Sequence, residues 1–337
     1  MKNTLLIQSA SPAEEKGPYR FFVTHDVHAK SAFASRLPYP DLLARVAAFK
    51  DEIDVLLKSW DTIGAQAAQH LSDLVKRGGS DVADGLLSDE AKNVICNFMD
   101  RDTVLALNDE ISAGLPWELL TVPTLPERQT VAEWMLVTRV CQQVPTNPLS
   151  ERRVARRQCA AWTTKGLQVS KRYETWLQRY GFKTISNRRE VLSHIADSKG
   201  IAVVAQSTLA RSAKSVTAGE RHKHGLKLDN GSEVYSYVDI VGTPMPMESI
   251  VFLFSCRTSG GPFAQEIVRA SRATVIASEF ELPADACSRL ACKVAGWLRG
   301  LDSARDISQV WMEEFQRLSP LASLFTMYGN WRGRIGP

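Results

Sequence analysis

Apolar residues recur along the first half of the chain at two different spacings. Four segments are mostly apolar or alternate apolar with polar residues, which is typical of strands; they are residues 4–10, 19–27, 103–109 and 135–144. Three others repeat apolar residues every three or four positions, the spacing of an amphipathic helix; they are residues 42–60, 63–77 and 89–99. The pattern predicts both strands and helices in this half.

The second half alternates the same two patterns more regularly. Its predicted strands are residues 160–166, 183–186, 201–207, 234–240, 249–255 and 273–278. Its predicted helices are residues 170–181, 188–200, 263–271 and 283–299. Because strands that alternate with helices usually form a parallel sheet, we expect an α/β fold with a mainly parallel central sheet and helices on both faces.

A polar, proline-containing stretch separates the two halves. The sequence PTNPLSERRVARRQ combines two prolines with a run of basic residues, which predicts a domain boundary near residue 150, with domains at 1–150 and 151–337. The basic run consists of Arg152, Arg153, Arg156 and Arg157. We interpret it as a solvated connector, with contact to phosphate or an acidic partner as the alternative.

Composition narrows the class of protein. The chain has 337 residues, 44% of them hydrophobic and 23% charged, which is ordinary for folded globular domains. Its net charge of +4 is too small for this length to indicate direct contact with nucleic acid. The N-terminal residues lack a signal-peptide pattern, and no run of about 18 apolar residues occurs. We therefore expect a cytoplasmic protein without a membrane-spanning segment.

Cysteine and glycine spacing excludes several kinds of site. The six cysteines form no CxxC pair and show no metal-ligand spacing with the six histidines, so we expect no metal and no cofactor. Their thiols are expected to be reduced, as is usual in a cytoplasm. Neither of the glycine-rich patterns GxGxxG and GxxxxGK[ST] occurs, which argues against a nucleotide-binding domain.

Cys256 is the best candidate for chemistry in the chain. It follows Ile250–Ser255, five of whose six residues are apolar, as in a central strand that is buried on both faces. In such sheets, ligands and catalytic groups gather where the strands end. The alternative is that Cys256 is a small buried packing residue. We interpret the remaining cysteines as packing residues: Cys96, Cys141, Cys159, Cys287 and Cys292.

Several segments together resemble a known family. They are GLPWELL, KLDNGSEVYSYVDI, VFLFSCRTSGG and ATVIASEFELPADACSRLACKVAGWLRG. In these segments the chain is similar to the CHAT family, caspase-like cysteine peptidases named for their association with the HetF protein and TPR repeats. The resemblance implies a separase-like architecture, in which residues 1–150 form a degenerate caspase-like half and residues 151–337 form the caspase-like peptidase half, an α/β/α sandwich.

The resemblance also implies roles for individual residues. Cys256 would be the nucleophile, and the backbone N–H groups of Cys256 and Ser207 would hold the oxyanion. The family histidine, expected as His-Gly at the end of the preceding strand, is absent, because that position falls on Gln206 or, with a shift of one residue, on Ala205. His224, which precedes a glycine in a polar loop, is the alternative base.

Two functions remain open at this point. The first is a cysteine endopeptidase that cleaves a specific partner protein in a regulated bacterial defence pathway, such as antiviral defence, or in cell death. A separate sensor or activator chain is expected, because the sequence contains no TPR repeat. The second is an inactive scaffold that binds and regulates a partner. The missing histidine is either natural, as in a pseudoprotease, or an inactivating substitution, and the sequence leaves both open.

Overall fold

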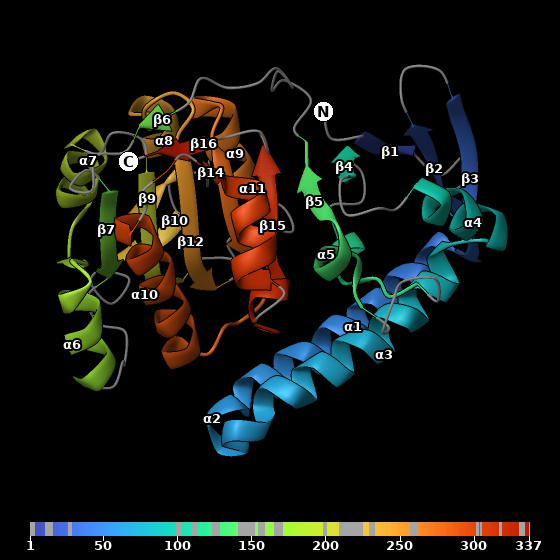
Figure 1. Cartoon of the computed structure of the whole chain (residues 1–337), viewed down its shortest axis with the longest axis horizontal. Coiled ribbons are helices and arrows are strands. Elements are labelled where there is room, and N and C mark those ends of the chain that lie inside the picture. The colour runs from blue at the N-terminus through green and yellow to red at the C-terminus, as the bar shows by residue number, and fades with distance from the viewer. Residues whose placement is uncertain are drawn as a thin grey trace. The chain divides into compact units, whose positions relative to one another are not determined.

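The chain forms two compact units (Figure 1). The computed structural model describes residues 4–10, 16–25, 29–98, 103–108, 114–122, 129–140, 152–153, 159–164, 171–197, 201–208, 225–228, 233–256, 262–300, 303, 305–316, 319–329 and 334–336. Unit 1 comprises Met1–Gln142 and Gln309–Thr326, and unit 2 comprises Gln143–Ser308 and Met327–Pro337. The first division thus precedes residue 150, and a late segment of the chain returns to unit 1.

Unit 1 contains a mixed sheet with the strand order β3-β2-β1-β4-β5. Its strands are β1 (Thr4–Ala10), β2 (Pro18–His25), β3 (Ala29–Pro38), β4 (Val104–Asn108) and β5 (Leu136–Arg139). β1, β2 and β3 pair antiparallel, whereas β1, β4 and β5 pair parallel. The apolar pattern predicted four of these strands and missed β3. In β3 a polar residue, Ser35, is buried as Phe33 is, so the strand does not have a continuous set of apolar buried positions.

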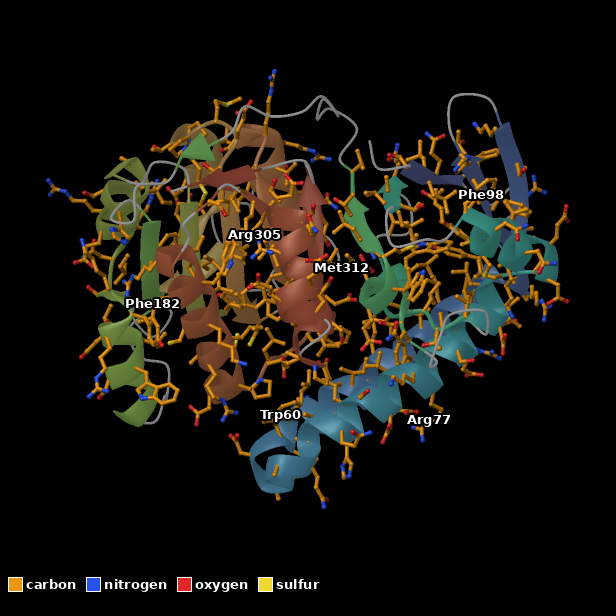
Figure 2. The ribbon with its side chains drawn as sticks, in the orientation of Figure 1. Trp60, Arg77, Phe98, Phe182, Arg305 and Met312 are labelled. Atoms are coloured by element: carbon orange, nitrogen blue, oxygen red, sulfur yellow. The ribbon has the colours of Figure 1, made fainter. Side chains whose placement is uncertain are left out.

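Two long helices, α1 and α3, form a hairpin beside this sheet. The helices are α1 (Tyr39–Lys58), α2 (Trp60–Ile63), the short 3-10 turn η2 (Gly64–Gln66), α3 (Ala67–Leu86) and α4 (Asp89–Phe98). α1 packs along α3, and Trp60 marks the start of α2 at the turn of the hairpin (Figure 2). At the end of α4, Phe98 stacks on His25 with ring centroids 3.8 Å apart.

Helix α3 is longer than the sequence pattern predicted. The expected end was residue 77, but the helix continues through Gly78 and Gly79. A Cβ atom on Gly78 would lie 2.2 Å from the Phe49 ring, and one on Gly79 would lie 2.0 Å from the carbonyl oxygen of Leu119. Both glycines therefore allow residues outside α3 to pack closely against it, Phe49 at Gly78 and Leu119 at Gly79. Each glycine costs about 1 kcal/mol in helix propensity.

The GLPWELL segment forms the short 3-10 turn η3 (Trp117–Leu119) in the core of unit 1. Trp117 is buried and packs edge-on against Phe21, with ring centroids 5.6 Å apart. The returning segment begins within α11 (Ile307–Val310) and contains the π-helix η7 (Trp311–Gln316) and η8 (Ala322–Leu324). η7 contacts α5 (Val131–Trp134), and η8 contacts η3.

Unit 2 contains a sheet whose neighbouring strands are β13-β12-β9-β7-β8. The strands are β7 (Cys159–Thr164), β8 (Lys183–Ile185), β9 (Ile201–Thr208), β12 (Ile250–Cys256) and β13 (Thr274–Ser278). All of these neighbours pair parallel, and Met327–Gly329, the end of β15 (Phe325–Gly329), lies beside β13. The predicted α/β fold with a mainly parallel sheet is confirmed.

The helices of unit 2 connect its parallel strands. They are α6 (Lys171–Arg179), α7 (Arg188–Asp197), α8 (Tyr237–Gly242), α9 (Pro262–Ser271) and α10 (Ala284–Gly300). α7 contacts β7, α9 contacts β13, and α10 contacts β9 and β12 (Figure 1). Each residue of β12 before Cys256 is buried, as the apolar run predicted for a central strand.

The segment 234–240, which was predicted to be one strand, is a strand followed by a helix. β11 (Glu233–Ser236) pairs antiparallel with β10 (Gly225–Leu228), and α8 begins directly after it. The change occurs at Ser236, whose backbone N–H and hydroxyl both donate to Oδ2 of Asp239, at 2.8 and 2.9 Å. This capping pattern outweighs the β-propensity of the neighbouring valine and tyrosine residues.

The basic run at the domain boundary lies partly in a strand. β6 (Arg152–Arg153) pairs parallel with β16 (Arg334–Gly336), which pairs antiparallel with β14 (Arg305–Asp306). The backbone of the first two arginines is therefore hydrogen-bonded in a sheet, within the stretch that we interpreted as a solvated connector. Arg156 and Arg157 lie outside the described residues.

Candidate functional site

Cys256 is the last residue of β12, at the carboxyl edge of the parallel sheet of unit 2. Unlike the rest of its strand it is half-buried, so its thiol is partly accessible. Its Sγ lies 3.7 Å from the carbonyl oxygen of Leu282, in the connection between β13 and α10. This is a contact that a protonated thiol makes as a weak donor.

The neighbouring strand β9 brings the expected histidine position to the same edge. β9 and β12 pair parallel with Ala205 opposite Phe254, but the register then shifts, and Thr208 is opposite Cys256. Gln206 and Ser207 therefore form a β-bulge across from the single residue that precedes Cys256. Bulges of this kind are common beside active sites, because they change the direction of the strand locally.

Part of the expected site lies outside the described residues. For Ala205, Gln206 and Ser207 the structure describes the backbone and not the side chains. Residues 257–261, which follow the cysteine, and the alternative base His224 are not described. The expected oxyanion donors, the N–H groups of Cys256 and Ser207, are brought to one edge of the sheet by the β9–β12 pairing.

His194 is the histidine of unit 2 that the structure describes, and it is not a base for Cys256. It lies on α7, with Nε2 3.4 Å from the carbonyl oxygen of Ala161 in β7. Ala161 pairs with Val203, which pairs with Phe252, four residues before Cys256 along β12. At about 3.3 Å per residue, this register places Ala161 roughly 13 Å short of the cysteine along the strand direction.

A second thiol lies on α10, the helix that packs against the strand of Cys256. Cys287, in the first turn of α10, is buried, as expected for a packing residue. Burial raises the pKa of its thiol well above the ordinary value, and the charge of Cys256 raises that pKa further. The sequence indicates only indirectly that Cys287 and Cys256 lie at the same edge of the sheet. A helix that follows a parallel strand begins at the carboxyl edge, where Cys256 also lies.

The corresponding edge of unit 1 is closed by a buried ion pair. Arg139, the last residue of β5, donates to both carboxylate oxygens of Glu118, at 2.8 and 2.9 Å, and to the carbonyl oxygen of Leu115 at 2.7 Å. Burial alone would raise the pKa of Glu118, but the charge and hydrogen bonds of Arg139 outweigh it, and the pKa is lowered. The sequence pattern does not indicate that Glu118 and Arg139 are partners, because they lie 21 residues apart in the chain.

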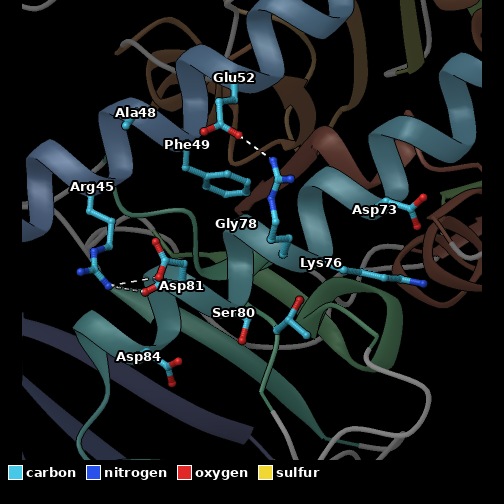
Figure 3. A pocket seen from close by; sticks show the side chains of 12 residues that line it. Arg45, Ala48, Phe49, Glu52, Asp73, Lys76, Gly78, Ser80, Asp81 and Asp84 are labelled. Carbon is cyan, nitrogen blue, oxygen red and sulfur yellow. Dashed lines mark hydrogen bonds and ion pairs between the residues drawn. The ribbon is translucent and has the colours of Figure 1, made fainter.

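A hollow of about 1000 Å³ lies on the α1–α3 hairpin of unit 1 (Figure 3). Arg45 donates to the carbonyl oxygen of Asp81 at 3.0 Å, and Arg77 pairs with Glu52 at 3.0 Å, so both arginines join the two helices. Neither cysteine nor histidine lines the hollow. Its charges therefore stabilise the hairpin, and we assign the candidate site to the edge that carries Cys256.

The fold and this edge define an α/β protein with an accessible cysteine at the end of a central parallel strand. No protein-family model matches the chain, and comparison with curated protein sequences also finds no match. Among the described residues, no group of three or more His, Cys, Asp or Glu side chains is arranged to hold a metal ion. None of the described helices has the length and apolar character needed to cross a membrane.

Proposed function

We propose that the protein is a caspase-like cysteine endopeptidase and that Cys256 is its nucleophile. The observation that carries this proposal is the half-buried thiol at the end of β12, next to the bulge in β9. A nucleophilic cysteine needs access to substrate, a base, and N–H donors for the oxyanion. The thiol meets the first requirement, and the strand ends of β9 and β12 are where the other two would be provided.

The strand order of unit 2 supports a caspase-like fold. Numbered along the chain from β7 to β13, its parallel strands follow the spatial order 2-1-3-4-5. This is a doubly wound order, in which helices cover both faces and ligands bind beyond the carboxyl ends of the strands. Cys256 ends the fourth of these strands, beside the third. In this proposal unit 2 is the peptidase half, and unit 1 is its degenerate counterpart.

A specific substrate is part of the proposal. By the family resemblance, the substrate is a partner protein of a bacterial defence or cell-death pathway, and a separate sensor or activator chain controls cleavage. During the reaction the sulfur would attack the peptide carbonyl, and the backbone N–H groups of Cys256 and Ser207 would stabilise the oxyanion. The proton of the thiol would need an acceptor, and Gln206 cannot accept it near neutral pH.

The position of Gln206 favours a second candidate function, an inactive scaffold that binds and regulates a partner. Glutamine in the bulge can hydrogen-bond to a peptide without transferring a proton. The loss of general base catalysis costs about 10²–10⁴ in rate. A protein of this kind would bind its partner without cleaving it.

The two functions are separated by assaying turnover with matched variants. The full chain and Cys256→Ala are incubated with a fluorogenic peptide library and with candidate partner proteins, in the presence of the activating chain. Turnover by the unaltered chain that is lost in Cys256→Ala supports the peptidase and contradicts the scaffold. Turnover in neither, together with retained partner binding in both, supports the scaffold and contradicts the peptidase.

Introducing a histidine tests the assignment of the site itself. Gln206 lies within the bulge, which faces the residue before Cys256. Ala205 instead lies opposite Phe254, which is two residues before Cys256 along β12. We therefore expect Gln206→His to increase turnover by about 10²–10⁴, and Ala205→His to do so much less. Equal effects of the two substitutions, or an increase that persists when Cys256 is replaced by Ala, would contradict this arrangement.

A further inference from the structure

The connection that contacts Cys256 also leads directly to a second cysteine. Cys256 Sγ lies 3.7 Å from the carbonyl oxygen of Leu282. The next residue, Pro283, accepts a hydrogen bond of 2.9 Å from the backbone N–H of Cys287. The segment Leu282–Pro283 therefore contacts both cysteines, the first through a carbonyl oxygen and the second through a helical hydrogen bond. In addition, α10, which carries Cys287, packs against β12, which carries Cys256.

The two thiols differ in accessibility. Cys256 is half-buried, whereas Cys287 is 3% exposed. The electrostatic interaction between the two, which contributes to the raised pKa of Cys287, agrees with their proximity. An oxidant would therefore react first at Cys256, and Cys287 would be protected from direct attack.

We propose that Cys256 and Cys287 form a reversible disulfide when the protein meets hydrogen peroxide. The thiolate of Cys256 attacks the peroxide, which gives a sulfenic acid at Cys256 and releases hydroxide. The thiol of Cys287 then attacks the sulfenic sulfur, which forms the S–S bond and releases water. In total the two thiols lose two electrons and two protons, and one peroxide is reduced to two waters.

This disulfide would protect and silence the thiol that the proposed function uses. A sulfenic acid that meets no second thiol is oxidised further to sulfinic and sulfonic acids, which thiol reductants do not reverse. Capture by Cys287 stops that sequence at a bond that a thiol reductant opens. The role as a switch rests on the proposed function of Cys256, whereas the chemistry of the pair does not depend on it.

The test identifies the bond directly. The reduced full chain is treated with hydrogen peroxide, its remaining thiols are blocked with N-ethylmaleimide, and it is digested without reductant for mass spectrometry. A disulfide requires the two Cβ atoms to be about 3.5–4.5 Å apart, so its formation reports directly on the approach of the side chains. We expect a peptide pair that joins Cys256 to Cys287 and is separated by dithiothreitol.

Two variants make the result specific. Cys287→Ser should abolish the cross-link, and Cys256 should then accumulate as sulfinic acid that dithiothreitol does not restore. Cys292→Ser, on the same helix, is the matched control and should leave the cross-link intact. If Cys287→Ser does not fold, as judged by circular dichroism, Cys287→Ala is used instead, because it leaves no buried hydroxyl.

Three outcomes would overturn the proposal: no cross-link in the folded chain, a cross-link from Cys256 to a different cysteine, or a cross-link that forms only in urea. Because the readout is the state of the thiols and not peptide cleavage, these outcomes are independent of the proposed peptidase. A chain that forms the disulfide but cleaves no peptide would retain this inference and lose the proposed function.

Discussion

The two units end comparable parallel strands in opposite ways. In unit 1, β5 ends in Arg139, whose guanidinium is buried and donates twice to Glu118. In unit 2, β12 ends in Cys256, which is half-buried beside a bulge in the adjacent strand. One strand end is filled by an internal ion pair, and the other leaves a reactive group accessible.

The same kind of strand end therefore holds an internal ion pair in one unit and a half-buried thiol in the other. A buried arginine–carboxylate pair uses the polar group at a strand end to hold a neighbouring turn. Removing a half-buried thiol at a strand end should therefore cost less stability than breaking this buried pair.

Breaking the ion pair of unit 1 should be severely destabilising. Glu118→Ala leaves the guanidinium of Arg139 buried without its carboxylate, and we expect the free energy of unfolding to fall by about 3–5 kcal/mol. Urea denaturation at pH 7 measures this change. The control is Glu52→Ala, which removes an exposed pair with Arg77 and should cost no more than about 1 kcal/mol. Equal losses in the two variants would contradict the contrast.

The same pair predicts a dependence of stability on acid pH. Because the pKa of Glu118 is lowered in the folded chain, its contribution is fully present above its ordinary value of 4.5 and is lost as pH falls through the folded-state pKa. Denaturation of the unaltered chain and of Glu118→Gln, measured from pH 7 to pH 3, should therefore converge at the acid end. Parallel curves over this range would show that Glu118 does not titrate as described.

Substituting Gly79, which packs against the turn that carries Glu118, should have a smaller effect on stability. In Gly79→Ala, the new Cβ would lie 2.0 Å from the carbonyl oxygen of Leu119, the residue after Glu118. We expect a loss of about 1–3 kcal/mol, because α3 must shift away from the turn. Gly114→Ala, at a position with no atom within 4 Å of the added Cβ, should be nearly neutral in the same thermal or urea unfolding measurement.

The sequence predicted much of the fold where the hydrophobic pattern was strong. In unit 2, β12 and β13 were predicted because buried strands are almost continuously apolar. The pattern failed where other effects decide the conformation: at β3, which buries Ser35, at Gly78 and Gly79, and at Ser236, where capping starts a helix. The returning segment of unit 1 received no prediction, because its order depends on contacts with residues far earlier in the chain.

The candidate site was predictable in part. The position of Cys256 at a strand end follows from the apolar run that precedes it. The bulge at Gln206 and the contact with Leu282 do not, because both depend on how separate strands and loops come together. For the same reason Cys287 was interpreted as a packing residue alone, although it also lies near Cys256.

The two cysteines should also differ in how much they contribute to stability. Cys287→Ser introduces a buried hydroxyl and should destabilise the chain by about 1–3 kcal/mol, whereas Cys256→Ser replaces a half-buried group and should change stability by no more than about 0.5 kcal/mol. Urea denaturation compares them. In labelling with iodoacetamide near pH 8, Cys256 should react well before Cys287, whose pKa is raised by burial. Equal labelling rates in the folded chain would contradict the difference in accessibility.

The return of Gln309–Thr326 to unit 1 has a consequence for synthesis of the protein on the ribosome. The first 142 residues emerge before the piece that completes their core, which includes Trp311, Phe315 and Phe325. All of unit 2 up to Ser308 is translated during that interval. The N-terminal unit is therefore expected to reach its final packing only after most of unit 2 has been made, and a nascent chain that stalls before residue 309 would expose its unfinished core to chaperones.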